Sequence, residues 1–512
     1  MTDALEISLL TFLSTCAGAE WHLSNAQKAT ITGIVFIGIV LGSLFWGQFA
    51  DRCGRRFSYL VSMSVISVGA LLSGASPNYQ SLILFRAIAG FGIGGATVPF
   101  DLFSEFLPGN CRGFYLICLE FFWCLGSMLV AAVAWASLES LGWRFLVYST
   151  IIPVIAATIL SIVYLPESPR WLWIKGRRDE AMEVIRNAAT INGVEISSQI
   201  KLIEFATVST TISSESEPEA SYWDLVSTAA ARRITIPLWV IWTVFGFTYY
   251  GTILFITRMF SNHDDLSSSS DSHENLQCEF NYPAIFYNST SEILAVAIAA
   301  FAIDNVGRVK TQSLFYALGA LAVVFMSFNI SFGFVLVFSI LARISAMASS
   351  VATWVATPEL FNTHLRTVGH GSSSAISKLG AFLSPFLVMS NASNVQVGLT
   401  LGICQLFAVI AAHCLPETAG SVMKEHMSVD QDLDTLHDGH SSPAVPSTTG
   451  QRSPSRWPSL LPILPTKENR AFAPVATSED NDSNVEPSTA VMFNPIQAAD
   501  KIRNIRGEKS HF

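Results

Sequence analysis

Three ionisable side chains lie within or beside apolar stretches of the chain, where an isolated charge is costly. Asp3 and Glu6 stand at the start of the first apolar run, and Lys378 stands in the middle of the eleventh. A carboxyl group withdrawn from water can take up and release a proton, whereas an ammonium group can hold an anionic solute or pair with a buried acid such as Asp101. We therefore expect Asp3 and Glu6 to act in proton coupling, unless they lie at the aqueous interface, and Lys378 to act in a cavity.

The composition indicates a protein whose surface faces lipid. Half of the 512 residues are hydrophobic and 13% are charged, compared with about 25% charged residues in a soluble protein. About 20 apolar residues cross the hydrocarbon core as a helix, which satisfies its own backbone polar groups. The first run would cover only about 25 Å, so we expect a truncated first helix. Twelve apolar runs predict twelve spans, at 4–20, 28–50, 57–76, 81–106, 114–137, 143–165, 234–257, 284–303, 312–330, 332–356, 367–389 and 396–415.

The placement of basic residues predicts the orientation, because Lys and Arg accumulate on the cytoplasmic side of a membrane. They gather after span two, between spans six and seven, and after span eight, whereas the loop 259–283 has none. Both termini are therefore expected in the cytosol. The Asn288 sequon then lies outside and is a candidate for glycosylation. We expect four parts: an N-terminal six-helix half at 1–165, a cytoplasmic linker at 166–233, a C-terminal six-helix half at 234–418 and a disordered cytoplasmic tail at 419–512.

Several classes of function find no support in the sequence. There is no phosphate-binding loop, no His-Glu-x-x-His and no nucleophile elbow, so we do not expect an enzyme. No basic face could meet nucleic acid. The eight cysteines form no Cys-x-x-Cys pair, so neither a metal site nor another cofactor is expected. Cys278 has no obvious external partner and is predicted to be a free thiol.

The charged loop motifs occur twice in the chain. They recur at offsets of 253, 254 and 250 residues, a regularity that predicts a duplicated six-span unit. The matching segments are Asp51-Arg52-Cys53-Gly54-Arg55 with Asp304-Asn305-Val306-Gly307-Arg308, Glu105 and Arg112 with Glu359 and Arg366, and Leu165-Pro166-Glu167-Ser168 with Leu415-Pro416-Glu417-Thr418. Arg86 and Arg343 also match, which favours a structural or gating role for both.

Each charged motif lies at the cytoplasmic end of a span, where acid–Arg pairs could latch the two halves together. Arg suits this role because its planar fork bonds a carboxylate at two points. Tilting of the halves would break the pairs and open a path; the alternative is that the charges only fix topology. The predicted gate comprises Asp51, Arg52, Arg55, Arg56, Glu105, Arg112, Glu167, Arg170, Asp304, Arg308, Glu359, Arg366 and Glu417.

The segment Gly47-Gln48-Phe49-Ala50-Asp51-Arg52-Cys53-Gly54-Arg55-Arg56 resembles the signature of the major facilitator superfamily. Pro166-Glu167-Ser168-Pro169-Arg170-Trp171-Leu172 is similar to a motif of sugar porters and organic-ion transporters. Asp3-Ala4-Leu5-Glu6, Phe245-Gly246-Phe247-Thr248-Tyr249-Tyr250-Gly251 and Thr357-Pro358-Glu359-Leu360-Phe361 resemble the branch of synaptic-vesicle-two-related proteins. The resemblance covers residues 2–418. It implies an all-α fold of twelve transmembrane helices in two halves, with Tyr249 and Tyr250 as candidates for lining the substrate path.

The resemblance implies a secondary active transporter of a small organic ion or nutrient. We expect proton coupling, alternating access and a monomer embedded in the bilayer of a plasma membrane or a vesicle. A facilitative sugar carrier is the alternative within the same fold. A vesicle-membrane receptor or scaffold that transports nothing is the alternative from another class.

Overall fold

The computed structural model describes residues 1–107, 112–193, 222–261, 278–361 and 365–418, all within one compact unit. These residues are helical apart from loops and one isolated bridge between Ser261 and Phe280. The predicted tail at 419–512 lies outside the described residues, as does the segment 194–221 of the predicted linker.

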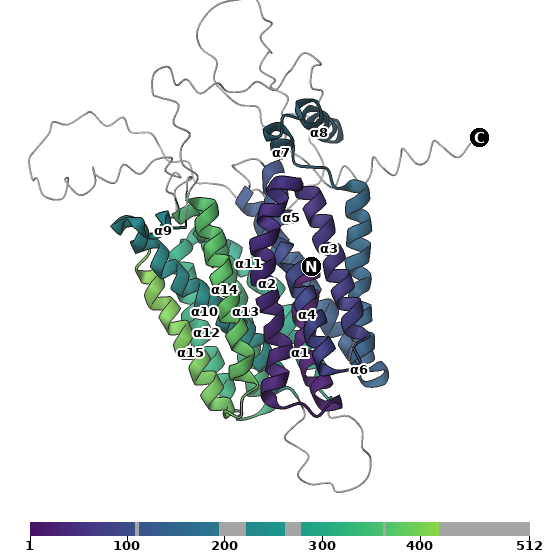
Figure 1. Ribbon diagram of the computed structural model, residues 1–512. Coiled ribbons are helices and arrows are strands. Elements are labelled where there is room, and N and C mark those ends of the chain that lie inside the picture. Colours follow the sequence, from purple (N-terminus) through teal and green to yellow (C-terminus); the bar gives the residue numbers. More distant parts are fainter. Residues whose placement is uncertain (108–111, 194–221, 262–277, 362–364, 419–512) are drawn as a thin grey trace, which may run out of the picture. The chain divides into compact units, whose positions relative to one another are not determined.

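Two groups of long helices make up the described chain (Figure 1). The N-terminal bundle consists of α1 (Thr2–Glu20), α2 (Asn25–Cys53), α3 (Arg55–Gly74), α4 (Tyr79–Ile93), η1 (Gly94–Ala96), α5 (Thr97–Phe106) and α6 (Arg112–Tyr164). The C-terminal bundle consists of α10 (Ala229–Met259), α11 (Tyr282–Asn305), α12 (Arg308–Ser327), α13 (Phe332–Leu360), α14 (Arg366–Val388) and α15 (Asn394–His413). Between them in sequence come the short α7 (Pro169–Ile174), α8 (Arg178–Ile191) and α9 (Asp224–Ser227).

Nine helical stretches in the described part are long and apolar enough to cross a membrane. One of them, in α6, leaves helical geometry at Gly142 (φ 75°, ψ 175°), so it comprises two of the predicted spans. The remaining predicted spans, α1 and α14, are helical as expected, but acids in α1 and a serine-rich stretch in α14 lower their hydropathy. Helix formation at every predicted span is confirmed, and the number of membrane crossings stays a prediction.

Packing within each bundle is close because small residues let helix backbones approach. A Cβ on Gly38 or Gly90 would clash with the facing backbone of α4 or α2, and one on Gly246 would clash with α14. Such small residues are common where membrane helices meet. The bundles meet mainly where α2 packs against α14 and α6 against α11, and to a lesser extent where α1 contacts α10 and α6 contacts α13. The space between the two bundles is therefore bordered by α1 and α6 on one side and by α10, α11 and α13 on the other.

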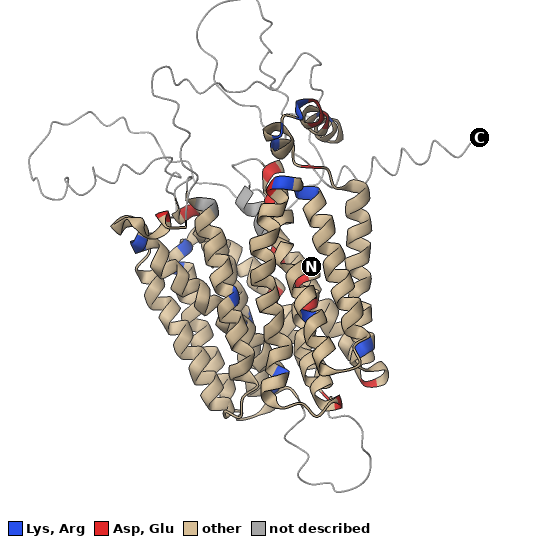
Figure 2. Ribbon diagram, in the orientation of Figure 1, with Lys and Arg blue, Asp and Glu red and all other residues tan. Residues whose placement is uncertain are grey.

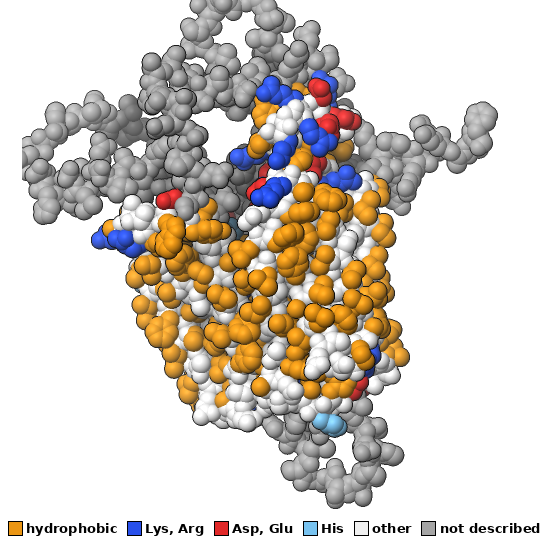
Figure 3. Space-filling view, in the orientation of Figure 1, with side chains coloured by type: hydrophobic (Ala, Val, Ile, Leu, Met, Phe, Trp, Pro, Cys, Tyr) orange, Lys and Arg blue, Asp and Glu red, His pale blue; other side chains and the backbone are white. Residues whose placement is uncertain are grey.

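Charge is concentrated at one end of the helices (Figure 2). We call it the charged end; it carries the loops that begin α3 and α12, together with α7 and α8 (Figure 1). Between the ends, hydrophobic side chains cover the visible surface (Figure 3), and residues such as Ile152 and Val163 are 69% and 63% exposed. Exposing large aliphatic side chains to water costs free energy. This belt is therefore the face that lipid would cover.

A disulfide joins the bundles at the opposite end, which we call the disulfide end. Cys16 of α1 is bonded to Cys278, just before α11, with Cα atoms 5.2 Å apart. The prediction of a free thiol at Cys278 is therefore wrong, because its partner is a residue 262 positions away that sequence reasoning had placed inside a span. Phe12 stacks edge-on against Phe280 nearby, with ring centroids 5.2 Å apart. A disulfide holds its Cα atoms within about 7 Å, so these segments cannot separate while the bond is intact.

Cleavage of the chain between α8 and α9, at an inserted protease site, should leave the two bundles covalently linked. In a denaturing gel the cleaved protein should migrate as one species without reductant and as two fragments with reductant. Cys278→Ser should yield two fragments under both conditions, and Cys404→Ser, which removes a free thiol, should behave as the unsubstituted protein. Separation of the unsubstituted protein without reductant would contradict the disulfide.

Candidate functional site

The beginning of α3 is capped by a carboxylate from a distant part of the chain. Gly54 adopts φ 110° between α2 and α3, and α3 has no side-chain cap of its own. Instead, the Glu167 Oε1 atom accepts hydrogen bonds from the backbone N–H groups of Arg55 (2.9 Å) and Arg56 (3.0 Å). A carboxylate is favourable here because a helix N-terminus carries free N–H groups and partial positive charge.

The C-terminal bundle repeats this arrangement. Gly307 adopts φ 111° before α12, and Glu417 Oε1 accepts from the N–H of Arg308 at 2.7 Å. The predicted duplication of the loop motifs therefore corresponds to one construction built twice, in which Glu167 and Glu417 cap equivalent helices. Glu167 and Glu417 therefore cap the N-termini of α3 and α12. This role was not predicted from the sequence.

The guanidinium of each motif is paired within its own bundle. Arg55 lies 3.1 Å from Asp51, 3.7 Å from Asp101 and 3.8 Å from Glu105. In the C-terminal bundle, Arg308 lies 3.1 Å from Glu359 and 3.9 Å from Asp304. Hydroxyl groups complete the clusters: Ser168 donates to Glu105, and Thr418 donates to Glu359.

None of these pairs joins the two halves, and the latch between them stays a prediction. The ion pairs of Arg55 and Arg308 hold each bundle together at the charged end, because their acids come from the same bundle. Arg56 donates to the Ile162 carbonyl, again within one bundle. Arg52 and Arg170 are exposed at this end. Arg112 and Arg366 begin α6 and α14, but their side chains lie outside the described part of the structure.

A buried ion pair crosses the N-terminal bundle. Glu6 Oε2 and Arg86 Nη1 are 3.0 Å apart, and both side chains are 1% exposed. Arg86 also donates through Nε to the Ser73 hydroxyl at 2.9 Å. Glu6 therefore lies inside the bundle and not at an aqueous interface. The predicted structural role of Arg86 agrees with this position, but pairing with Glu6 was not foreseen.

A second buried ion pair lies in the C-terminal bundle. Glu292 Oε1 of α11 is 2.9 Å from Arg343 Nε of α13, and these side chains are 0% and 5% exposed. The Tyr249 hydroxyl donates to the same carboxylate at 3.0 Å. In turn it accepts from Trp123 Nε1, on α6 of the other bundle, at 2.8 Å. The indole N–H of Trp123 therefore joins the two bundles.

Glu292 is the buried residue that sequence reasoning missed. The sequence could have identified Glu292, because it is an acid in the middle of the apolar run 284–303. Lys378 was identified by the same criterion. Glu120 of α6 interacts electrostatically with it from the other bundle.

Lys378 lies between the bundles with a different set of neighbours from those predicted. Its Nζ atom donates to the Tyr250 hydroxyl at 3.3 Å and lies 5.5 Å from the centroid of that ring. Asp3 interacts with it electrostatically across the interface. Asp101, the acid suggested as its partner, pairs with Arg55 instead. The structure thus brings Asp3, Tyr250 and Lys378 together and places Glu6 and Tyr249 in the two ion-pair networks.

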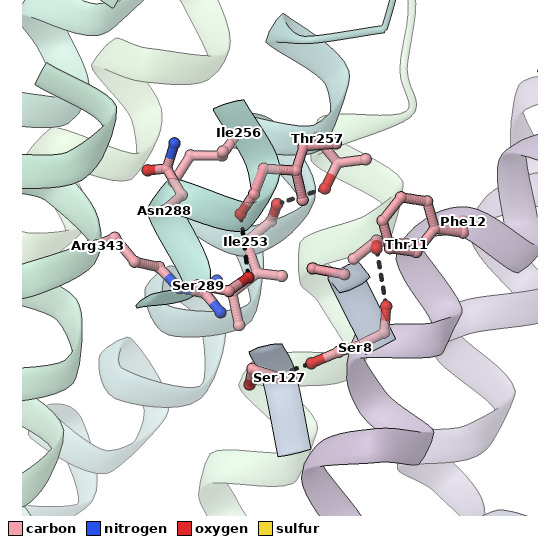
Figure 4. A pocket seen from close by; sticks show the side chains of 12 residues that line it. Ser8, Thr11, Phe12, Ser127, Ile253, Ile256, Thr257, Asn288, Ser289 and Arg343 are labelled. Atoms are coloured by element: carbon pink, nitrogen blue, oxygen red, sulfur yellow. Dashed lines mark hydrogen bonds between the residues drawn. The ribbon is translucent and has the colours of Figure 1, made fainter. Parts of the chain in front are cut away.

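A small polar cavity lies where the bundles meet (Figure 4). Its free volume of about 20 Å³ is enough for a water molecule and too small for an organic solute. Hydroxyl groups line it from both bundles, and Arg343 is the charged residue among its lining. The lining residues are Ser8, Thr11 and Phe12 of α1, Ser127 and Ala131 of α6, Ile253, Ile256 and Thr257 of α10, Ile285, Asn288 and Ser289 of α11, and Arg343 of α13.

Asn288 lies on this wall, and the prediction of a glycan there is wrong. The side chain is 2% exposed, and its Nδ2 atom donates to the Ala284 carbonyl (2.9 Å) and the Ser339 hydroxyl (3.0 Å). A buried amide that is already bonded cannot accept a glycan. No cluster of potential metal ligands occurs among the described residues.

Substitution of Gly54 by Ala should destabilise the protein. The residue would adopt a positive φ, and its Cβ would lie 2.5 Å from Glu167 Oε2, so the helix cap would be lost. Such backbone strain costs about 1–3 kcal/mol. The apparent melting temperature of the purified protein should fall clearly for Gly54→Ala. Gly47→Ala, in the same motif but with open space around the new Cβ, is the matched control; equal melting temperatures would refute the capping role.

Comparison with known proteins agrees with this geometry. The family model described as sugar (and other) transporter matches residues 7–429. The putative transporter svop-1 of Caenorhabditis elegans is 34% identical over 83% of this chain and 82% of its own length. The synaptic vesicle 2-related protein of Xenopus laevis is 30% identical over 88% and 83%, and the organic cation/carnitine transporter 7 of Arabidopsis thaliana is 29% identical over 80% and 85%.

Solved structures support the same fold. The partially occluded, inward-open xylose transporter XylE from E. coli superposes with a TM-score of 0.59, over 82% of this chain and 98% of that chain, at 18% identity. The predicted all-α membrane fold of the major facilitator type is thereby confirmed. The chain belongs to the sugar (and other) transporter family and is a multi-pass membrane transporter.

Proposed function

We propose that this protein is a proton-coupled secondary transporter that moves a small organic solute by alternating access. The observation that carries the proposal is the position of Glu6. This buried carboxylate lies on α1, paired with Arg86, and the next turn of the same helix lines the cavity between the bundles through Ser8 and Thr11.

Protonation of Glu6 would change the forces on α1. A buried ion pair is held by mutual attraction that offsets a large desolvation cost, and neutralising one partner removes that attraction. The Glu6 Oε1 atom has no hydrogen-bond partner among the described residues, so a proton could be added there without displacing a protein donor. A change in protonation would thus loosen α1 from α4 and alter the wall of the cavity.

The cavity in its present form is too small for an organic solute. A solute must enlarge it, and the way to do so is to move the N-terminal helices α1 and α6 relative to α10, α11 and α13. The proton:xylose symporter XylE shares this fold, which supports coupling to protons here. We also propose that Asp3 and Lys378, which interact across the same interface, change their separation during this movement.

A facilitative sugar carrier is the second candidate. The hydroxyl groups of Ser8, Thr11 and Ser127 offer the neutral hydrogen bonds that a polyol needs, and the matching family model is described by sugar transport. The difference lies in whether a proton gradient drives accumulation.

We further propose a vesicle or plasma membrane as the site of action, with both termini in the cytosol and one chain as the functional unit. Several relatives are synaptic vesicle 2-related proteins, which favours a vesicle. The gate residues at the charged end, including Arg112 and Arg366, would then face the cytosol.

Replacement of Glu6 by Gln should abolish accumulation driven by a proton gradient. In proteoliposomes screened with a solute library, a gradient of about one pH unit supplies about 1.4 kcal/mol per proton, enough for up to about tenfold accumulation with one coupled proton. Glu6→Gln cannot change protonation, so the gradient should no longer drive accumulation while exchange of internal for external solute continues. Uptake of radiolabelled solute measures both activities.

Glu20→Gln is the matched control, because Glu20 lies at the other end of α1 in a partly exposed pair with Arg144 (2.7 Å). It should retain accumulation. Undiminished accumulation by Glu6→Gln would place coupling elsewhere. Transport by the unsubstituted protein that ignores the gradient would favour the facilitative carrier, and solute binding without uptake or exchange would favour a receptor.

A further inference from the structure

We propose that Arg343 binds the carboxylate of an organic-anion solute in the cavity between the bundles, and that Glu292 takes up the accompanying proton. This inference rests on the proposed transport function and specifies its substrate class. It assigns Arg343 a role in binding, where the repeat in the sequence had favoured structure or gating.

Arg343 reaches the cavity with unused hydrogen-bond donors. The side chain is 5% exposed and contacts Glu292 through Nε. The structure shows no hydrogen bond from its two terminal nitrogens to any described residue. In Figure 4 the guanidinium lies beside Ser289, on the opposite side of the cavity from Ser8 and Ser127. A buried guanidinium with free terminal N–H groups matches the two oxygens of a carboxylate.

The far wall offers donors for the same anion. Ser8 of α1 and Ser127 of α6 form a long hydroxyl–hydroxyl contact of 3.3 Å, which either group could exchange for a bond to a carboxylate oxygen. A bound carboxylate would then contact Arg343 from the C-terminal bundle and serine hydroxyls from the N-terminal bundle. The solute would thereby bridge the two bundles, which must move relative to each other during transport.

The charge balance around Arg343 requires a proton. Glu292 neutralises Arg343 at present, so a solute carboxylate would bring a second negative charge to one guanidinium in a medium of low dielectric constant. The other groups that face Glu292 are the hydroxyl of Tyr249 on α10 and Glu120 and Cys124 on α6. Of these, Glu120 adds negative charge. A proton taken from water onto Glu292 Oε2, which has no partner among the described residues, restores neutrality.

Lys378 is the competing cation, and the structure places it differently. It does not line the cavity, and its ammonium group already contacts Tyr250 and interacts with Asp3. Arg86 is also excluded, because it is enclosed within the N-terminal bundle with Glu6 and Ser73. The cavity therefore assigns the anion to Arg343.

Direct binding tests this assignment without any transport step. The purified full chain in lipid nanodiscs would be titrated with radiolabelled acetate, butyrate and benzoate, each compared with its uncharged amide. At least one carboxylate should bind about tenfold or more tightly than its amide. Binding should remove about one proton per carboxylate from a weakly buffered solution, as measured with a pH indicator.

Substitutions then separate the two roles. Arg343→Gln should weaken carboxylate binding by about tenfold or more, and Arg343→Lys should restore part of it. Glu292→Gln, which resembles the protonated acid, should bind the carboxylate without proton uptake. Arg144→Gln removes a comparable Arg–Glu pair outside the cavity and should bind as the unsubstituted protein does. Monodisperse elution shows that each variant is folded.

Four results would overturn the proposal: no carboxylate in the series binds, the amides bind equally well, Arg343→Gln binds normally, or binding is lost in Lys378→Gln while Arg343→Gln retains it. If Arg343→Gln does not fold, Arg343→Lys, the comparison of carboxylate with amide and the proton uptake still decide. Intact binding and proton uptake without accumulation in proteoliposomes would instead overturn the proposed transport function. Gradient-driven accumulation of neutral solutes alone would overturn only the assignment to Arg343.

Discussion

Neutralisation of charge in the helical interior is the constraint on which the other features of this protein depend. A carboxylate or guanidinium away from water is tolerated when it is paired, and the residues that the structure describes include two such buried pairs, Glu6–Arg86 and Glu292–Arg343. Each pair joins helices of one bundle and so stabilises that bundle as a unit. Each is also sensitive to the arrival of a proton or an anion, since either would change the balance of charge. Stability of the fold and response to ligands therefore have the same physical origin here.

The connection between the bundles is of another kind. Trp123 and Tyr249 share a hydrogen bond across the interface, and Tyr249 also bonds to Glu292. A change at the Glu292 carboxylate is thus one hydrogen bond away from the residue that contacts the opposite bundle. This short chain of donors gives a physical route by which binding in the cavity could alter the fit of one bundle against the other.

The two ends of the molecule are held differently. At the disulfide end, the Cys16–Cys278 bond and the Phe12–Phe280 contact join the bundles. At the charged end, Glu167 and Glu417 each join two segments of one bundle and do not connect the two bundles. Toward that end, the aromatic contact between Phe100 and Trp354, with ring centroids 6.0 Å apart, joins α5 to α13. A covalent bond cannot lengthen, whereas two aromatic rings in contact can move apart, so movement between the bundles is easier at the charged end.

The helices and the duplicated loops could be predicted from the order of the amino acids alone. Apolar runs of helical length leave few alternatives in a membrane, and the spacing of Gly54 and Glu167 relative to Gly307 and Glu417 is visible in one dimension. Ionisable residues in apolar runs also pointed to the interior, as Glu6 and Lys378 show.

Which of these residues meet could not be predicted, because it depends on how the helices pack in three dimensions. Cys16 and Cys278 lie 262 residues apart, and Trp123 and Tyr249 lie 126 apart. Three further features were not predicted from the sequence. They are the partners of Glu6 and Lys378, the burial of Asn288, and the pairing of Arg55 within its own bundle. The reason is physical: helix periodicity depends on neighbours three or four residues away, whereas the rotation and depth of one helix against another depend on the packing of the whole bundle.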